Sequence, residues 1–189
     1  PGVRIGIVVP ELHNQRDAIQ HTLDEILIPE IFYPENQNQT PPYNFSLGKT
    51  LSLFLPISIA LSALSFFGAT LRFETISQLL RSPLIVGWTQ ESGARALLDV
   101  KLREIGEPVF TIDTLIGLST RFGCDTTCPI FLQRLRSTRK WLMVNQSNVK
   151  PGQWSSRFDQ ILRMMGWLED YSLSQEMFQL ISAWRELFA

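Results

Sequence analysis

Residues 51–69 read LSLFLPISIALSALSFFGA, the longest apolar run in this 189-residue chain. The run approaches the length of a membrane span, but Pro56 interrupts it and serines are scattered along it. The basic flank that is typical of a signal peptide is missing. We therefore interpret residues 57–67 as a helix buried in a protein core, with Gly68 as its end signal, and we expect no membrane partner.

The chain beyond residue 52 reads as almost entirely helical. Residues 72–83 form a helical pattern that closes before Pro83. The next pattern, residues 89–106, begins at Thr89, a favourable N-cap, with Glu91 in the first turn. Further helices are predicted over residues 111–122, 129–145, 153–168 and 172–188, and Ser172 with Gln175 fits a capping box at the start of the last one.

The N-terminal part has a different pattern. Residues 3–9, VRIGIVV, form a β-branched run that is typical of a buried parallel strand, and Pro10 ends it. Residues 14–27 then place apolar side chains at helical spacing. After a proline-flanked polar loop, residues 43–47 alternate large and small side chains as a short second strand would.

A strand, a short turn and a helix make up half of a βαβ unit. The predicted fold class is therefore α/β but predominantly helical, with a small, partial parallel sheet of about two strands and a large helical bundle. The predicted domains are residues 1–51, a partial α/β element, and residues 52–189, a helical domain.

The composition limits the possible functions. Hydrophobic residues make up 44% of the chain, enough for one sizeable core or two small ones. The formal net charge is −1, so any contact with DNA must come from a local basic patch. The sequence starts PGVRIG without Met and ends inside an amphipathic pattern, so we expect it to be a fragment of a longer protein.

Gly48, Lys49 and Thr50 match the end of a phosphate-binding loop. That motif needs another glycine five positions before the Gly-Lys pair, so that backbone N–H groups can surround the phosphates. Tyr43 occupies this position, and two prolines precede it. We therefore expect no ATP binding at this loop.

No complete active site or metal site is evident, so we expect a non-catalytic chain without a cofactor. Cys124 and Cys128 are the only cysteines, and a zinc site or an iron–sulfur cluster needs more ligands than these two. His13 and His21 lie far away in sequence. We interpret the cysteines as buried or loop thiols, able at most to form a disulfide with each other.

One local cluster of basic residues stands beside a tryptophan. The cluster contains Arg134, Arg136, Arg139 and Lys140, followed by Trp141. On a helix, Arg136, Arg139 and Lys140 share a face. Such cations can bind a nucleic-acid backbone while the ring stacks on a base. The alternative is an ordinary solvated helix face, and the sequence leaves both possibilities open.

Three segments together resemble one family. Residues 4–19, RIGIVVPELHNQRDAI, resemble the fourth motif region of superfamily 1 helicases, the opening strand and helix of their second RecA-like domain. Residues 42–85 resemble the segment that follows, with a short strand ending in glycine, a long apolar helix and a helix closing at Ser-Pro. Residues 154–187 are similar to the later helical part of AddB-like proteins, helicase-related subunits of bacterial double-strand-break repair nucleases.

The resemblance to AddB-like and RecC-like proteins shows which residues of the helicase motif are present in this chain and which are replaced. In active helicases, the first arginine of this motif contacts the terminal phosphate of the nucleotide, but here that position is Pro10. Only the later arginine, Arg16, is matched. Gly48 would end the second strand, and Lys49 and Thr50 would lead into a helix. AddB-like and RecC-like subunits are known for such eroded helicase motifs.

The resemblance also implies a function. We expect a scaffolding or DNA-channel segment of a cytoplasmic bacterial DNA repair protein, with residues 52–189 as the helical insertion of the second RecA-like domain. Its expected partners are DNA, bound weakly and without sequence specificity, and other domains of the parent chain or a nuclease–helicase partner subunit. The alternative is a helical protein–protein interaction module without DNA binding.

Overall fold

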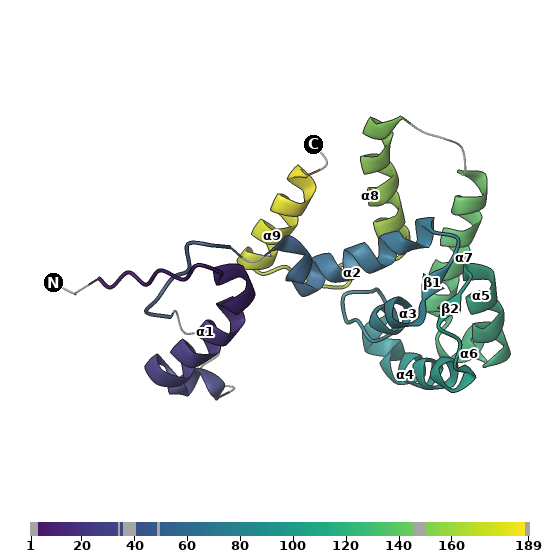
Figure 1. Ribbon diagram of the computed structural model, residues 1–189. Coiled ribbons are helices and arrows are strands. Elements are labelled where there is room, and N and C mark those ends of the chain that lie inside the picture. The colour runs from purple at the N-terminus through teal and green to yellow at the C-terminus, as the bar shows by residue number, and fades with distance from the viewer. Residues whose placement is uncertain (1–3, 34, 36–40, 49, 146–149, 188–189) are drawn as a thin grey trace. The chain divides into compact units, whose positions relative to one another are not determined.

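The computed structural model describes residues 4–33, 35, 41–48, 50–145 and 150–187 (Figure 1). The chain divides into two compact units, Pro1–Lys49 and Thr50–Ala189. This division lies close to the boundary at residue 51 that the sequence predicts. The predominantly helical character of the chain is confirmed.

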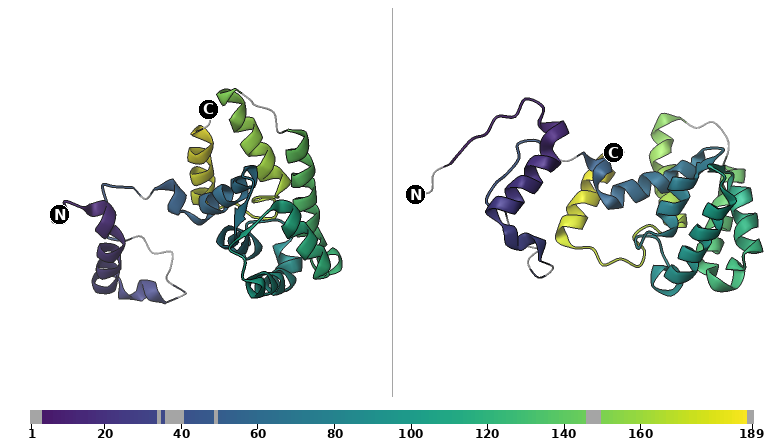
Figure 2. Two further views of the ribbon diagram at one scale, coloured as in Figure 1. Left: turned by 45° about the vertical axis from the view of Figure 1, so that its right-hand side comes forward. Right: turned by 60° about the horizontal axis from the view of Figure 1, so that its bottom comes forward.

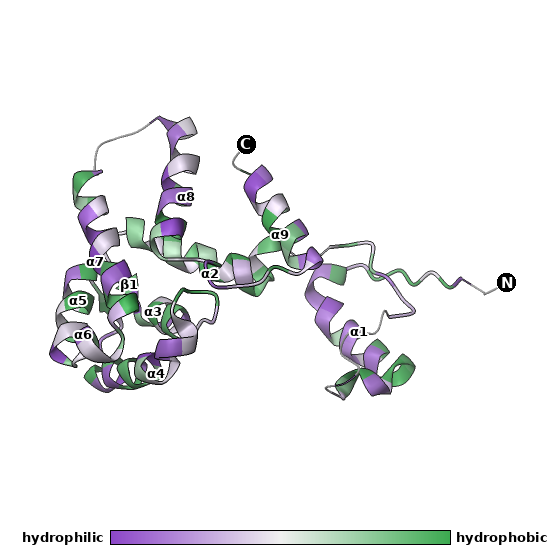
Figure 3. Cartoon of the chain, turned by 180° about the vertical axis from the view of Figure 1, so that it is seen from behind, coloured by the Kyte–Doolittle hydropathy of each residue, from purple (hydrophilic) through white to green (hydrophobic). Residues whose placement is uncertain are grey.

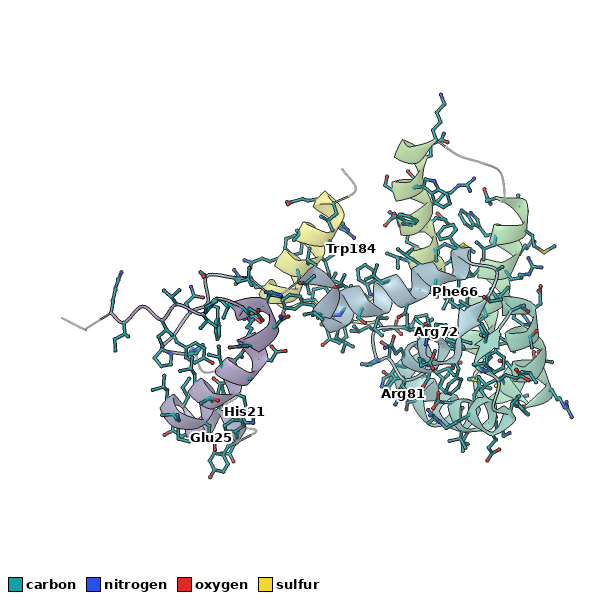
Figure 4. The ribbon with its side chains drawn as sticks, viewed as in Figure 1. His21, Glu25, Phe66, Arg72, Arg81 and Trp184 are labelled. Carbon is teal, nitrogen blue, oxygen red and sulfur yellow. The ribbon has the colours of Figure 1, made fainter. Side chains whose placement is uncertain are left out.

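The first unit contains one long helix and little buried apolar surface. Helix α1 spans Leu12–Leu27 and is followed by the 3-10 helix η1, Pro29–Phe32. Among the described residues of this unit, only Asp24 and Ile28 are buried. His21 and Glu25 project from α1 as exposed side chains (Figure 4). A unit with so small a core depends on polar contacts for its structure.

Both strands that the sequence predicts for this unit are wrong. Residues 4–9 have no strand structure, and Ile5, Ile7 and Val8 are exposed. Residues 43–47 are also irregular. A strand forms only when a neighbouring strand satisfies its backbone N–H and C=O groups, and the described part of this unit has no such neighbour. The β-branched pattern therefore indicates a β propensity, but residues 4–9 do not form a strand.

The second unit is a bundle of helices. Its helices are α2 (Leu55–Leu64), α3 (Phe73–Leu80), α4 (Trp88–Ile105), α5 (Ile112–Arg121), α6 (Cys124–Thr127), α7 (Pro129–Val144), α8 (Trp154–Met164) and α9 (Gln175–Glu186). Three 3-10 turns, η3 (Leu51–Leu53), η4 (Ser65–Phe67) and η5 (Pro151–Gln153), flank α2 and α8. Figure 2 shows α7 and α8 as neighbouring helices in both of its views.

The sheet of the described structure is antiparallel, and the predicted parallel sheet is wrong. It pairs β1, Leu71–Arg72, with β2, Val109–Phe110, so that Leu71 faces Phe110 and Arg72 faces Val109. Both strands belong to the second unit. Each has only two residues, which is too short to produce the alternating pattern by which strands are recognised in a sequence.

Helix α2 forms the centre of the second unit, as the apolar run predicts. Figure 3 shows it as hydrophobic along most of its length. Ile57, Ile59, Ala60 and Ala63 are all buried, and α3, α8 and α9 pack against the helix. No helix in the described part of the chain is long and apolar enough to cross a membrane.

A buried ion pair connects α4 to its surroundings. The Arg95 side chain is fully buried and the Glu91 side chain is 3% exposed, and Arg95 Nη2 lies 2.7 Å from Glu91 Oε2. Arg95 also donates hydrogen bonds to the carbonyls of Ile85 and Val86. The Glu91 carboxylate accepts the N–H groups of Ile130 and Phe131, at 2.5 and 3.1 Å.

These contacts make Glu91 the N-terminal cap of α7. The first N–H groups of a helix have no partner within the helix, and an acceptor from elsewhere satisfies them. Pro129, the first residue of α7, has no N–H, and the next two residues donate theirs to Glu91. We define these two side chains, Glu91 and Arg95, as the polar hub.

Two helix starts differ from the sequence prediction. Helix α4 begins at Trp88 with Gly87 as its N-cap, rather than at Thr89. Helix α9 is capped by Ser174, whose hydroxyl accepts the Met177 N–H, rather than by Ser172. The Gly87 start follows from packing, because φ is +80° and a Cβ there would lie 2.9 Å from both Arg95 Nη2 and Ile130 Cγ2.

Gly87→Ala is therefore expected to destabilise the second unit by about 1–3 kcal/mol, through left-handed strain and the clash with Arg95. Gly93→Ala in the same helix is the matched control, because a Cβ there meets nothing within 4 Å. The control should be neutral or stabilising by up to about 1 kcal/mol. Urea unfolding of both variants measures the difference, and an equal effect of the two substitutions would contradict this packing.

Candidate nucleic-acid interface

Helix α7 carries all five residues of the predicted interface. It packs against α5, α6 and α8. Its buried residues are Phe131, Leu132, Leu135 and Thr138, so the residues between them face outward or toward the edges of neighbouring helices. Arg134, Arg139 and Trp141 are half-buried, while Arg136 and Lys140 are exposed.

Each of the three arginines pairs with a carboxylate on a different segment. Arg134 Nη2 lies 2.7 Å from Glu169 Oε1, beyond the end of α8. Arg136 Nη2 lies 2.8 Å from Asp125 Oδ1 on α6. Arg139 binds Asp113 on α5 through two hydrogen bonds of 2.6 and 2.7 Å. These arginines therefore tie α7 to its neighbours.

The pairing changes the electrostatics of the cluster. Three carboxylates offset three of its four positive charges at close range, and only Lys140 forms no ion pair with another described residue. The hydrogen bond from Arg139 lowers the pKa of Asp113, and the same contact raises the pKa of Arg139. The local basic field is weaker than the sequence alone suggests.

Trp141 belongs to a group of aromatic rings rather than standing alone. Phe67 contacts Trp141, Trp154 and Phe158 edge-to-face, with ring centroids 6.1, 5.4 and 5.7 Å away. All four rings are half-buried, and we call them the aromatic cluster. The Arg157 guanidinium lies 5.7 Å from the Trp154 ring centroid. The cluster joins η4, α7 and α8.

Sequence reasoning missed the α8 half of this cluster, although a signal was present. Trp154 and Phe158 are four residues apart, and so lie on one face of α8, with Arg157 one residue before Phe158. Aromatic residues beside an arginine are the same kind of signal that drew attention to Trp141, which follows Arg139 and Lys140. Phe67 gave no such signal, because it lies within the long apolar run.

Arg16, the matched arginine of the helicase-like motif, contacts its own unit. Its Nη1 donates a hydrogen bond to the Leu47 carbonyl, and its guanidinium lies 4.7 Å from the Phe45 ring centroid. The Tyr43 hydroxyl donates to Asp24, and burial, followed by this hydrogen bond, raises the pKa of Tyr43 to about 12. These contacts hold residues 43–47 against α1.

The remaining candidate groups lie as follows. Gly48 is exposed, and Lys49 lies outside the described residues. Cys124 and Cys128 are buried free thiols. Within the described ranges, no three His, Cys, Asp or Glu side chains form a group that could hold a metal ion.

Comparisons with models of protein families, with curated proteins and with solved structures find no match to this chain.

The Arg139–Asp113 pair predicts a pH-dependent contribution to stability. Asp113 has a lowered pKa in the folded chain, so its contribution is present above the ordinary aspartate pKa and is lost as pH falls through the lowered value. Asp113→Asn should therefore reduce the free energy of unfolding slightly at neutral pH, and this difference from wild type should vanish in acid.

Glu104→Gln is the control for this measurement, because Glu104 is exposed and forms no ion pair with another described residue. Its unfolding curve should follow that of wild type at every pH. If Asp113→Asn had no effect at neutral pH, or a larger one in acid, the assigned role of the pair would be wrong.

Proposed function

We propose that this chain is a non-catalytic helical segment of a bacterial, cytoplasmic AddB-like DNA repair protein. In that role it contributes scaffold and DNA-channel surface during the processing of double-strand breaks. Its partners are DNA and either the other domains of the parent chain or a nuclease–helicase partner subunit. The similarity of residues 4–19, 42–85 and 154–187 to this family supports the assignment.

The aromatic cluster, together with the exposed Lys140 that precedes Trp141 in the chain, is the observation that carries the DNA part of the proposal. Proteins that bind single strands without sequence preference combine cations that contact phosphates with aromatic rings on which bases stack. Trp141 and Trp154 are half-buried, so each ring keeps part of its surface accessible to a base. Lys140 is exposed and free of an ion pair with other described residues, so its ammonium group is available to a phosphate.

The ion pairs of α7 set the expected strength of binding. Arg134, Arg136 and Arg139 already bind carboxylates, so recruiting them to DNA would require breaking these contacts. With few free cations, binding should be weak and independent of sequence, at roughly 10⁻⁴–10⁻⁶ M or weaker, and it should decrease steeply with salt.

A second candidate function, a helical protein–protein interaction module, is supported by a different observation. A groove of about 440 Å³ lies between α8 and α9, with Phe158, Leu162, Trp167 and Trp184 in its lining. Trp184 comes from α9 (Figure 4) and is only 6% exposed. The aromatic side chains in this lining favour a protein partner, but Asp159, Arg163 and Arg185 also line the groove, which weakens that interpretation.

Lys140→Ala is the variant that tests DNA binding by α7. Because Lys140 forms no ion pair within the described structure, its removal does not disturb the bundle. It should weaken the binding of an oligothymidine single strand at low salt and reduce the slope of log affinity against log salt by about 1. Quenching of tryptophan fluorescence measures the binding.

Arg185→Ala is the matched control, because Arg185 is also exposed and has no ion pair with another described residue, but lies on α9. It should bind as wild type does. Equal binding by wild type and Lys140→Ala, with equal salt slopes, would show that Lys140 on α7 does not contact DNA. A loss confined to Arg185→Ala would place the contact in the α8–α9 groove instead.

A further inference from the structure

The two cysteines flank the short helix α6, four residues apart. Cys124 is the first residue of this short helix and Cys128 follows its last residue. Both are free, and they are 2% and 0% exposed. The Cys128 backbone N–H donates to the Cys124 carbonyl at 3.1 Å, and each thiol is the largest single influence on the pKa of the other. The two side chains are therefore close enough to interact.

The backbone positions are compatible with a bond between the sulfurs. Residues one helical turn apart have Cα atoms separated by about 6 Å, which is within the span of about 4.4–6.8 Å that a disulfide bridges. Cys128 itself has left the helical conformation, with φ −141° and ψ 59°. Its side chain is therefore not held in the direction that a continuing α-helix would give it.

A small cavity gives access to Cys124. Its volume is about 200 Å³, and Ala94, Leu97, Lys101, Phe122 and Thr127 line it together with Cys124. Leu97 is 65% exposed, so the cavity lies close to the protein surface. A water molecule occupies roughly 30 Å³ of liquid volume. The space therefore suits a reagent of a few atoms, such as hydrogen peroxide, better than a peptide disulfide.

The surroundings make the two thiols unequal. The hydrogen bond from Cys128, with help from Thr127 and the charge of Lys101, lowers the pKa of Cys124 against the opposing effects of burial and Asp125. The same hydrogen bond, together with burial and the charges of Cys124 and Glu91, raises the pKa of Cys128. Thiolates are the nucleophiles in thiol oxidation, so this environment suits Cys124 to the first attack.

We propose that Cys124 and Cys128 form an oxidisable dithiol, which a small hydroperoxide converts into an intramolecular disulfide. The Cys124 thiolate attacks one peroxide oxygen, the O–O bond breaks, and the departing hydroxide takes up a proton to become water. Cys124 is then a sulfenic acid. The Cys128 sulfur attacks the Cys124 sulfur, the S–O bond breaks, and the oxygen leaves as water with the Cys128 proton. Two thiols are oxidised and one peroxide is reduced to two waters.

The bond would form directly beside the polar hub. Cys128 is the N-cap residue of α7, and Glu91 binds the Ile130 and Phe131 N–H groups just beyond it. The disulfide would therefore tie the start of α6 to the residue that precedes α7.

Treatment of the folded chain with hydrogen peroxide tests the proposal. Wild type should lose both thiols and two hydrogens of intact mass, and dithiothreitol should reverse the change. Cys128→Ser should stop at a Cys124 sulfenic acid, which dimedone traps. Cys124→Ser should react more slowly, because the pKa of its remaining thiol, Cys128, is raised and little thiolate is available.

Lys101→Met should slow the reaction of wild type, while Lys150→Met, at an exposed position outside the cavity lining, should leave the rate unchanged. Wild-type thiols that react only after denaturation would overturn the proposal. Equal rates for the two single cysteine variants would also overturn it, and if a variant fails to fold, the wild-type reaction alone decides.

Discussion

The buried ion pair between Arg95 and Glu91 is the interaction on which the second unit depends. Neither side chain is more than 3% exposed, and together they bind the carbonyls of Ile85 and Val86 and the first N–H groups of α7. The Arg95 guanidinium also lies 5.0 Å from the Phe131 ring centroid. A buried charge without its partner is strongly destabilising, so neither residue is replaceable alone. One pair thus fixes α4, the segment after α3 and the start of α7.

The position of α7 in turn determines what its basic residues can do. Once α7 is anchored at its N-terminus, Arg134, Arg136 and Arg139 reach carboxylates on three neighbouring segments, and Trp141 packs against Phe67. Most of the basic cluster therefore serves the bundle itself. The proposed DNA contact is reduced to Lys140 and the accessible parts of the aromatic cluster, which is consistent with a segment that supports a nucleic-acid path rather than binding DNA tightly by itself.

The sequence predicts α1–α5 and α7–α9, because helical patterns are local; it does not predict the four-residue α6, which is too short to show a period. It does not predict their contacts. Arg139 and Asp113 are 26 residues apart, and Arg134 and Glu169 are 35 apart, so no local pattern links them. Glu91 looks like an ordinary first-turn acid until α7 is placed beside it. The run at residues 3–9 fails for the opposite reason, since β propensity is local but a strand needs a partner. The pairing of Trp154 and Phe158 on one face of α8 could have been predicted from the sequence, because they are four residues apart.

A double-mutant cycle on Glu91→Gln and Arg95→Met, measured by urea unfolding, tests the central claim most directly. Each single variant should lose about 3–5 kcal/mol of unfolding free energy, because each leaves a buried polar group without its partner. The double variant should lose much less than the sum of the two. Single losses below about 1 kcal/mol that add independently in the double variant would contradict the account, because the pair would then behave like an exposed one.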